Sequence, residues 1–349
     1  MIVSEQPPSW AHPSVNSEVL DEALGRLSST APEFAGGLSN HGPMVCEALA
    51  HLGRADAISP WLDAYVSRLE EGPGRGRPLA RDEWAGALGV ARRYSDWAAL
   101  FEQELSARPW PDVVAAWVPR LLPGPMAAAT HGLIRAAHAT RALAEAETPE
   151  RRCELAAGLA YWASQYRALG GAPAPSGTLR VRQALAKMPT VPIDERGHGL
   201  ISVGAIKASR IGGFAASVDA LRPPPSVEGA LSELTSAMAG WYLANCEHAP
   251  IAFVHGVTAP AALRLLLPYL PARAAGTAFA YLWQSCAAIR SAFAVGHPPV
   301  DADLEPPGDE ELVANALEAG GAHAIKLTLK QAHRAIDSLR GFPEAVRGS

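Results

Sequence analysis

The chain alternates between alanine- and leucine-rich stretches, in which apolar residues recur at helical spacing, and short stretches rich in glycine and proline. Apolar residues three or four positions apart line one face of a helix, whereas strands show an alternating Val, Ile and Thr pattern that this sequence lacks. Glycine and proline favour turns, and they predict breaks at residues 72–78, 170–175, 222–225 and 297–299. The pattern therefore predicts an all-α fold, a single large helical domain with irregular Pro/Gly-rich connections.

Three of the predicted helices carry clear start or stop signals. Residues 148–150, Thr-Pro-Glu, combine an N-cap, a proline at the first helical position and an acid in the first turn, so a helix is expected to begin there and to end at residues 170–171. A second helix, with acids in its first turn, is expected to end at residues 320–321. His323 is expected to open a third, which stops near Gly341.

Composition limits the class of protein. Of the 349 residues, 48% are hydrophobic, which is enough for a sizeable core. We expect residues 1–15 to be a loosely ordered N-terminal tail and residues 16–349 to form the helical domain. The formal net charge is -5 and no dense basic block occurs, so we expect no nucleic-acid partner. The sequence does not decide the oligomeric state, and a homodimer stays open.

We expect a cytoplasmic protein without a membrane span. The first residues lack the basic start and the apolar run of a secretory signal. The four cysteines are scattered, with no Cys-x-x-Cys pair, so neither a disulfide framework nor a cysteine-rich zinc site is indicated. Apolar stretches such as residues 260–269 are interrupted by Arg264 and Pro268 and are far shorter than the ~20 residues of a bilayer span.

Several familiar catalytic signatures are absent from the sequence. No Gly-x-Gly-x-x-Gly follows a predicted strand, and there is no Walker loop, no His-Glu-x-x-His and no Gly-x-Ser-x-Gly. A Rossmann flavoenzyme, a P-loop enzyme, a zincin and an α/β-hydrolase are therefore disfavoured. The residues left to consider are eleven histidines, several of them in apolar helical surroundings.

Two of these histidines have simple structural explanations beside a functional one. His41 opens an apolar stretch, where it is either a buried ligand or a helix N-terminal residue satisfied by backbone, and taken alone the second is favoured. His255 stands between large apolar groups and a Gly-Val-Thr segment, where it is either a ligand or a hydrogen-bonded core histidine. His131 and His138 lie two turns apart on one helix face, ~10 Å along the axis, so we expect one ligand and one supporting residue.

His323 and Lys326 form the most unusual pair, because they share one helix face at i and i+3 in apolar surroundings. Burial and a nearby cation lower the pKa of a lysine, and the neutral amine can then add carbon dioxide to give a carbamate, an anionic oxygen ligand. Imidazoles with one such oxygen suit Fe(II), and the lack of thiolates argues against structural zinc.

Four segments of the sequence resemble the questin oxidase-like family when they are taken in order. They are Asn40-His41-Gly42, His131-Gly132-Leu133-Ile134, Val254-His255-Gly256-Val257-Thr258 and His323-Ala324-Ile325-Lys326. The resemblance covers residues from about 20 to about 339. That family is mostly helical and includes fungal enzymes that oxidise anthraquinones by Baeyer–Villiger-type oxygen insertion or by ring cleavage.

The resemblance implies a metal-binding site. It assigns His41, His131, His255 and His323 as ligands of a non-haem Fe(II) and Lys326 as a carboxylated lysine ligand. Relatives often carry His-x-x-x-His at the second segment, whereas here Arg135 stands in place of the second histidine, with His138 nearby.

The implied activity is that of an O2-using oxidoreductase, a mono- or dioxygenase of secondary metabolism, acting on a flat aromatic, polyketide- or anthraquinone-type substrate. The candidate catalytic residues are Arg135, which would stabilise an anion, and His138, which would transfer protons. Aromatic side chains that could stack on the substrate are Trp241, Tyr242, Phe253, Phe279 and Trp283, although each is more often simply core.

Two other readings keep the same fold. One is a metal-free monooxygenase fed by NADPH, in which the histidines act only as acids and bases; NADPH also stays open as an external reductant for the iron enzyme. The other is a non-catalytic helical protein that binds an aromatic ligand.

Overall fold

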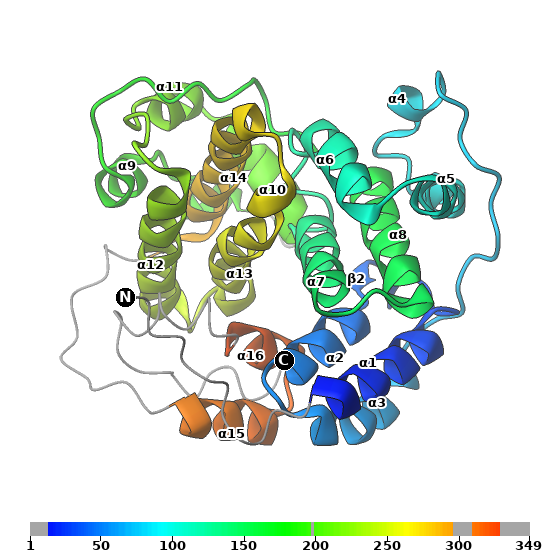
Figure 1. Ribbon diagram of the computed structural model, residues 1–349. Coiled ribbons are helices and arrows are strands. Elements are labelled where there is room, and N and C mark those ends of the chain that lie inside the picture. The colour runs from blue at the N-terminus through cyan, green and yellow to red at the C-terminus, as the bar shows by residue number, and fades with distance from the viewer. Residues whose placement is uncertain (1–12, 197–198, 296–308, 329–349) are drawn as a thin grey trace, which may run out of the picture.

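The computed structural model describes residues 13–196, 199–295 and 309–328, in which nearly all regular secondary structure is helical. These ranges hold 16 α-helices and one two-stranded sheet (Figure 1). The predicted all-α fold is confirmed.

The α-helices, in chain order, are α1 Pro13–Leu27, α2 Gly42–His51, α3 Ile58–Val66, α4 Trp84–Ala87, α5 Tyr94–Ala107, α6 Trp110–Leu121, α7 His131–Glu145, α8 Pro149–Ser164, α9 Val181–Lys187, α10 Ile201–Ser209, α11 Phe214–Asp219, α12 Val227–Asn245, α13 Pro250–Leu266, α14 Ala272–Phe293, α15 Asp309–Ala319 and α16 Ala322–Leu327. Short 3-10 helices are η1 Ala55–Ala57, η2 Ala91–Arg93, η3 Ile193–Glu195 and η4 Leu267–Tyr269. Strands β1 Glu33–Phe34 and β2 Leu38–Ser39 pair antiparallel just before α2.

The helix signals of the sequence are confirmed at most ends. α8 begins at Pro149, where the Thr148 hydroxyl accepts from a backbone amide of the first turn. It ends at Ser164 rather than near residue 170, so that expectation is wrong. A long-range contact explains the early end, because Arg167 pairs with Pro125 in a β-bridge and its backbone is therefore extended rather than helical. α15 ends just before Gly320, which takes a positive φ of 63°.

The Gly- and Pro-rich breaks at 72–78, 170–175 and 222–225 are free of helix, as predicted. The break at 297–299 and the helix end near Gly341 lie outside the described residues.

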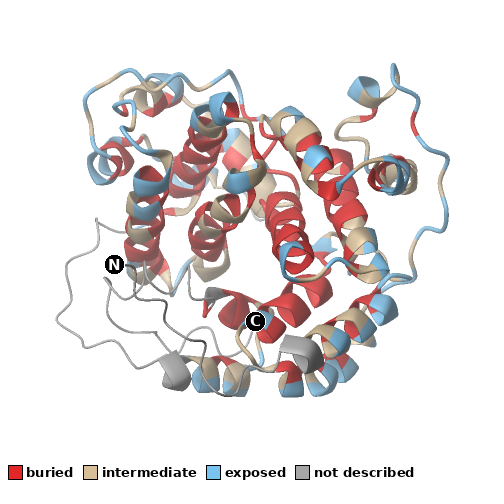
Figure 2. Cartoon of the chain, in the orientation of Figure 1, coloured by how far each residue is buried: buried red, intermediate tan, exposed pale blue. Residues whose placement is uncertain are grey.

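Helix α7 lies at the centre of the core. Its first thirteen residues are all buried, and it packs against α8, α13 and α2 (Figures 1 and 2). α13 in turn packs against α12 and α14, and the short α16 contacts both α2 and α13. This arrangement brings α2, the second helix, into contact with α16, the last helix of the described residues.

Two glycines allow the central helices to approach closely. A Cβ on Gly132 of α7 would lie 2.6 Å from the backbone of Trp162 on α8, and one on Gly256 of α13 would lie 2.2 Å from Met238 on α12. Pro260 leaves the Gly256 carbonyl without its helical partner, and the Cys286 thiol lies 3.8 Å from that carbonyl and donates to it.

The segment Pro250–Tyr269, α13 with η4, is long and apolar enough to cross a membrane by length and composition, which the sequence analysis did not expect. Arg264 and Pro268 do not interrupt the helical run as assumed. Because 67% of its 18-residue apolar window is buried inside the structure, core packing accounts for the composition of this segment. The absence of a membrane span stays a prediction.

We predict that Gly132→Ala lowers the free energy of unfolding by about 1 to 3 kcal/mol, because the new methyl group would clash with the backbone of α8 at Trp162, which can move only if the helix moves. Gly25 of α1 is the matched control, since a Cβ there has open space and Gly25→Ala should raise stability by about 0.5 to 1 kcal/mol. Urea unfolding measures both. Equal stabilities of the two variants would contradict the close packing of α7 on α8.

Candidate metal centre

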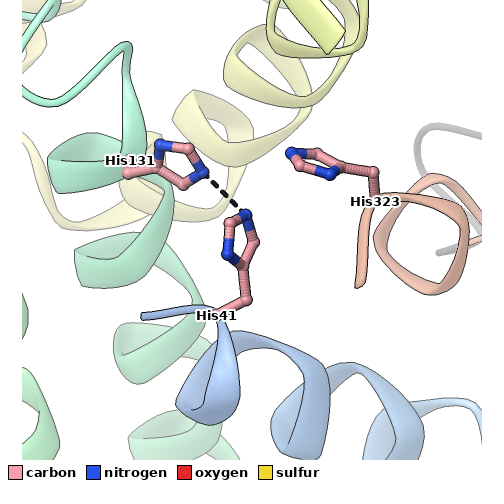
Figure 3. Close-up of side chains that lie close together, drawn as sticks. All are labelled: His41, His131 and His323. Atoms are coloured by element: carbon pink, nitrogen blue, oxygen red, sulfur yellow. Dashed lines mark hydrogen bonds between the residues drawn. The ribbon is translucent and has the colours of Figure 1, made fainter. Parts of the chain in front are cut away.

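Four histidines from four different helical segments converge at the end of α7. The ring centroids are 4.7 Å apart for His41 and His131, 4.4 Å for His131 and His255, 5.6 Å for His255 and His323, and 4.7 Å for His323 and His41. The rings thus form a closed circle. All four are buried, with at most 9% of any residue exposed. Figure 3 shows three of them pointing toward one another from α2, α7 and α16.

Backbone carbonyls fix the orientation of two rings. His41 Nδ1 lies 2.7 Å from the Ser39 carbonyl oxygen, and His131 Nδ1 lies 2.7 Å from that of Ala128. A carbonyl can only accept, so each Nδ1 carries the proton and donates it. In a neutral imidazole the other nitrogen, Nε2, is then an unprotonated donor of an electron pair.

The two Nε2 atoms face each other at 2.9 Å (Figure 3). Two lone pairs at this distance repel unless a cation lies beside both. Burial, followed by neighbouring cationic groups, lowers the pKa of His41 and of His131 well below the usual range, which disfavours an imidazolium. Two nitrogens bound at right angles to one metal ion at about 2.1 Å lie roughly 3 Å apart. The spacing therefore fits a pair of metal ligands.

His323 completes a group of three. Its candidate ligand atom and those of His41 and His131 all lie within 4.8 Å of one another. His323 Nε2 is buried and has no hydrogen-bond partner within the described residues, and burial, then Lys326, lowers the pKa of His323 to about 3. A neutral imidazole nitrogen without a hydrogen-bond partner that faces two others is suited to be a third metal ligand.

His255 closes the circle from α13. Its Nδ1 lies 3.3 Å from the hydroxyl oxygen of Thr130, the residue before His131. Burial, then the charges of His131 and His323, lowers the pKa of His255 well below the usual range. This ring is therefore also neutral at physiological pH.

Lys326 lies one turn after His323 on α16 and is only 1% exposed. Its Nζ has no hydrogen-bond partner in the described part of the chain, and burial lowers its pKa to about 7. The pKa values of all four histidines are lowered by its charge, so it lies in the same electrostatic neighbourhood. A large share of this amine is neutral at pH 7, the form that reacts with carbon dioxide.

The loop before α2 holds His41 through contacts that the sequence analysis missed. Asn40 donates to the Thr30 hydroxyl and the Ala31 carbonyl, and its own side-chain oxygen accepts from the Gly42 amide. The His41 amide donates to the Tyr65 hydroxyl at 2.8 Å. Because Thr30, Ala31 and Tyr65 lie 9 to 24 residues from their partners, no local pattern signals these three contacts.

His138 does not lie in the circle of rings but pairs with Glu47 of α2. Its Nδ1 is 2.5 Å from Glu47 Oε2, and Arg141 binds the same carboxylate with two bonds of 2.6 and 2.7 Å. Burial lowers the pKa of His138, although Glu47 opposes this, so Nδ1 donates and Nε2 is left as a base. Glu47, an acid within an apolar helix, is a functional candidate that the sequence analysis overlooked. A catalytic role of His138 stays a prediction.

Arg135 forms a buried ion pair with Glu154 of α8. Its Nε and Nη2 donate to the Glu154 carboxylate at 2.6 and 2.8 Å, and both side chains are largely buried. The guanidinium is therefore already engaged by a full negative charge, and its role toward a substrate anion stays a prediction.

The five aromatic residues proposed to bind a substrate are all buried core side chains. Trp283 donates to the Val218 carbonyl, Trp241 lies under the Arg290 guanidinium, and Phe279 lines a pocket of about 210 Å³ near the start of α12. Phe253 precedes His255 by two residues on α13, and Tyr242 lies on α12. Their role in substrate binding stays a prediction.

No model of a known protein family matches this sequence, and no curated protein is significantly similar to it. The resemblance to the questin oxidase-like family therefore rests on the four motifs alone, and the geometry above carries the argument for a site.

We predict that Glu47→Gln lowers the free energy of unfolding by about 3 to 5 kcal/mol at pH 7, because Arg141 then loses its buried partner. Burial raises the pKa of Glu47, but Arg141 and His138 outweigh it and hold that pKa well below its usual range. The stabilisation is therefore present above the unfolded-state pKa, near 4.3, and disappears as the pH falls further.

Urea unfolding of the wild type and the variant between pH 7 and pH 3 measures this difference. Glu145→Gln, at the exposed end of α7, is the control and should change stability by less than about 1 kcal/mol. A gap between wild type and Glu47→Gln that does not narrow in acid would contradict the ion-pair assignment.

Proposed function

We propose that this protein is a metal-dependent oxidoreductase whose metal ion is held by His41, His131 and His323, with His255 and a carboxylated Lys326 completing the set. The single observation that carries the proposal is the contact between two Nε2 atoms, each left unprotonated by an Nδ1 bond to a carbonyl. The orphaned His323 Nε2 and Lys326 Nζ support it.

The donor set favours Fe(II) among the common metals. Imidazoles suit iron, zinc and copper, and one added carboxylate-like oxygen makes the set harder and shifts it toward iron. No cysteine and no carboxylate belongs to the group of candidate ligands found in the described residues. A carbamate on Lys326 would therefore be the one anionic ligand and would offset part of the charge of the ion.

The reaction class we propose is the insertion of oxygen into, or the cleavage of, a carbon–carbon bond of a flat, electron-rich aromatic substrate. When bound, the iron supplies one-electron redox chemistry with dioxygen. The motif resemblance supports the substrate class. With the carbamate as its one anionic ligand, a divalent centre keeps a net positive charge, which suits a phenolate or hydroquinone anion better than a cationic substrate.

The chain's own residues have three tasks in this proposal. Backbone carbonyls orient the imidazoles of His41 and His131, so these two rings need not rearrange when the metal binds. The apolar helices around them exclude bulk water, which strengthens every charge interaction in the site. His138, oriented by Glu47, would hold or move a proton at its Nε2.

The metal site is tested by the iron content of protein expressed in iron-supplemented cells with bicarbonate present. We expect about one iron per chain in the wild type and a loss of at least tenfold in affinity in His131→Ala and in Lys326→Ala. His248→Ala is the matched control, because His248 is exposed, lies in the turn between α12 and α13, and is not one of the candidate ligands. A wild type without iron, or a loss that is equal in His248→Ala, would sink the proposed site.

The activity is tested by oxygen uptake with an anthrahydroquinone, with and without NADPH. We expect uptake above the protein-free rate of hydroquinone autoxidation only in iron-loaded protein, because the histidines alone provide no group that reacts with dioxygen. Uptake by iron-free protein that depends on NADPH would favour the metal-free monooxygenase. Binding of the aromatic without oxygen uptake in iron-loaded protein would favour the non-catalytic binding protein.

A further inference from the structure

The segment directly before His131 has an unusual backbone. Ala128, Ala129 and Thr130 have φ angles of 46°, 55° and 75°, the left-handed region that residues with a side chain rarely adopt. Ala35 is the other residue besides glycine with positive φ in the described ranges. A run of three such residues, ending in a β-branched threonine, is strained, and strain of this kind persists only where the surroundings enforce it.

The strained turn places two oxygen atoms against two of the four imidazoles. The Ala128 carbonyl accepts from the His131 amide at 3.1 Å and from His131 Nδ1 at 2.7 Å. The Thr130 hydroxyl lies 3.3 Å from Nδ1 of His255, on a different helix. One turn thus contacts the Nδ1 atoms of both rings.

A turn between α6 and α7 does not require residues with side chains at these three left-handed positions. Glycine adopts positive φ at little cost, yet none of the three positions is glycine. The Thr130 side chain is fully buried, and its hydroxyl makes its hydrogen bond, within the described residues, to His255. The residue that bears the largest conformational cost is therefore the one whose side chain reaches the site.

We infer that Thr130 is a positioning residue of the metal centre, whose hydroxyl accepts the Nδ1 proton of His255 so that this ring presents Nε2 to the ion. The inference rests on the proposed metal site. The left-handed turn is retained because it gives His131 and His255 the same tautomer from one rigid piece of backbone. If Thr130 donated to Nδ1 instead, His255 would turn an N–H toward the metal and could not ligate it.

Three variants separate the hydroxyl from the backbone. Thr130→Val keeps the shape and removes the hydrogen bond, Thr130→Ser keeps the hydroxyl, and Ala129→Gly eases the turn without touching either. We expect Thr130→Val to weaken the binding of Co(II), used as a visible probe, by about 10- to 100-fold and to change its absorption bands. Thr130→Ser should bind within a few-fold of the wild type. Ala129→Gly should raise the melting temperature of the metal-free protein and leave Co(II) affinity within a few-fold.

The tautomer of His255 is measured independently of any metal by nitrogen-15 NMR of histidine-labelled, metal-free protein. We expect the Nδ1–H form in the wild type and in Thr130→Ser, and a mixture in Thr130→Val. An Nε2–H form in the wild type, or equal Co(II) affinity of wild type and Thr130→Val, would overturn the role of Thr130 while leaving the metal site standing. A wild type that binds neither iron nor Co(II) would instead overturn the proposed function, and the inference with it.

Discussion

The structure depends on one constraint, which is that His41 and His131 each give their Nδ1 proton to a backbone carbonyl. Each hydrogen bond requires its carbonyl oxygen at a defined position. This requirement constrains the backbone of the loop before α2 and of the turn before α7. Asn40 holds the loop through three hydrogen bonds, and the turn uses three consecutive residues with positive φ. The cost, roughly 1 to 2 kcal/mol for each left-handed residue, is borne by the packing of the helices that follow.

That packing is built around basic groups on α7 that are matched by acids on its neighbours. Arg135 is bound by Glu154 of α8, whereas His138 and Arg141 share Glu47 of α2. Buried ion pairs add little net stability over apolar packing, but an incorrect register would leave a charge without a partner. The pairs therefore specify how α2 and α8 sit on α7.

A glycine follows each of three histidines of the site, His41, His131 and His255. At all three glycines a Cβ would come closer than 3 Å to a neighbouring segment.

The sequence pattern predicted the helical class and most breaks and helix starts, and the motif resemblance, rather than the pattern, singled out the four histidines whose rings lie together. Apolar periodicity and Gly/Pro punctuation are local, and they were strong here. The end of α8 was misplaced because a β-bridge of Arg167 with distant Pro125 decides it. Thr130 and Glu47 went unnoticed for the same reason, since their partners are 125 and 91 residues away. The helical run Pro250–Tyr269 is longer than predicted, because a single arginine and a single proline do not end it.

The four rings come from positions 90, 124 and 68 residues apart along the chain, taken in order from His41 to His323. An ion held by them would act as a crosslink that closes three long loops, and such a crosslink stabilises a fold chiefly by restricting the unfolded chain. Its effect would not be uniform. α7 is embedded on several sides, whereas α16 has six residues and rests mainly on α2, α13 and α15. The ion would thus hold α16 against the rest of the fold. When the ion leaves, α16 would be the first helix to detach, well before the core opens.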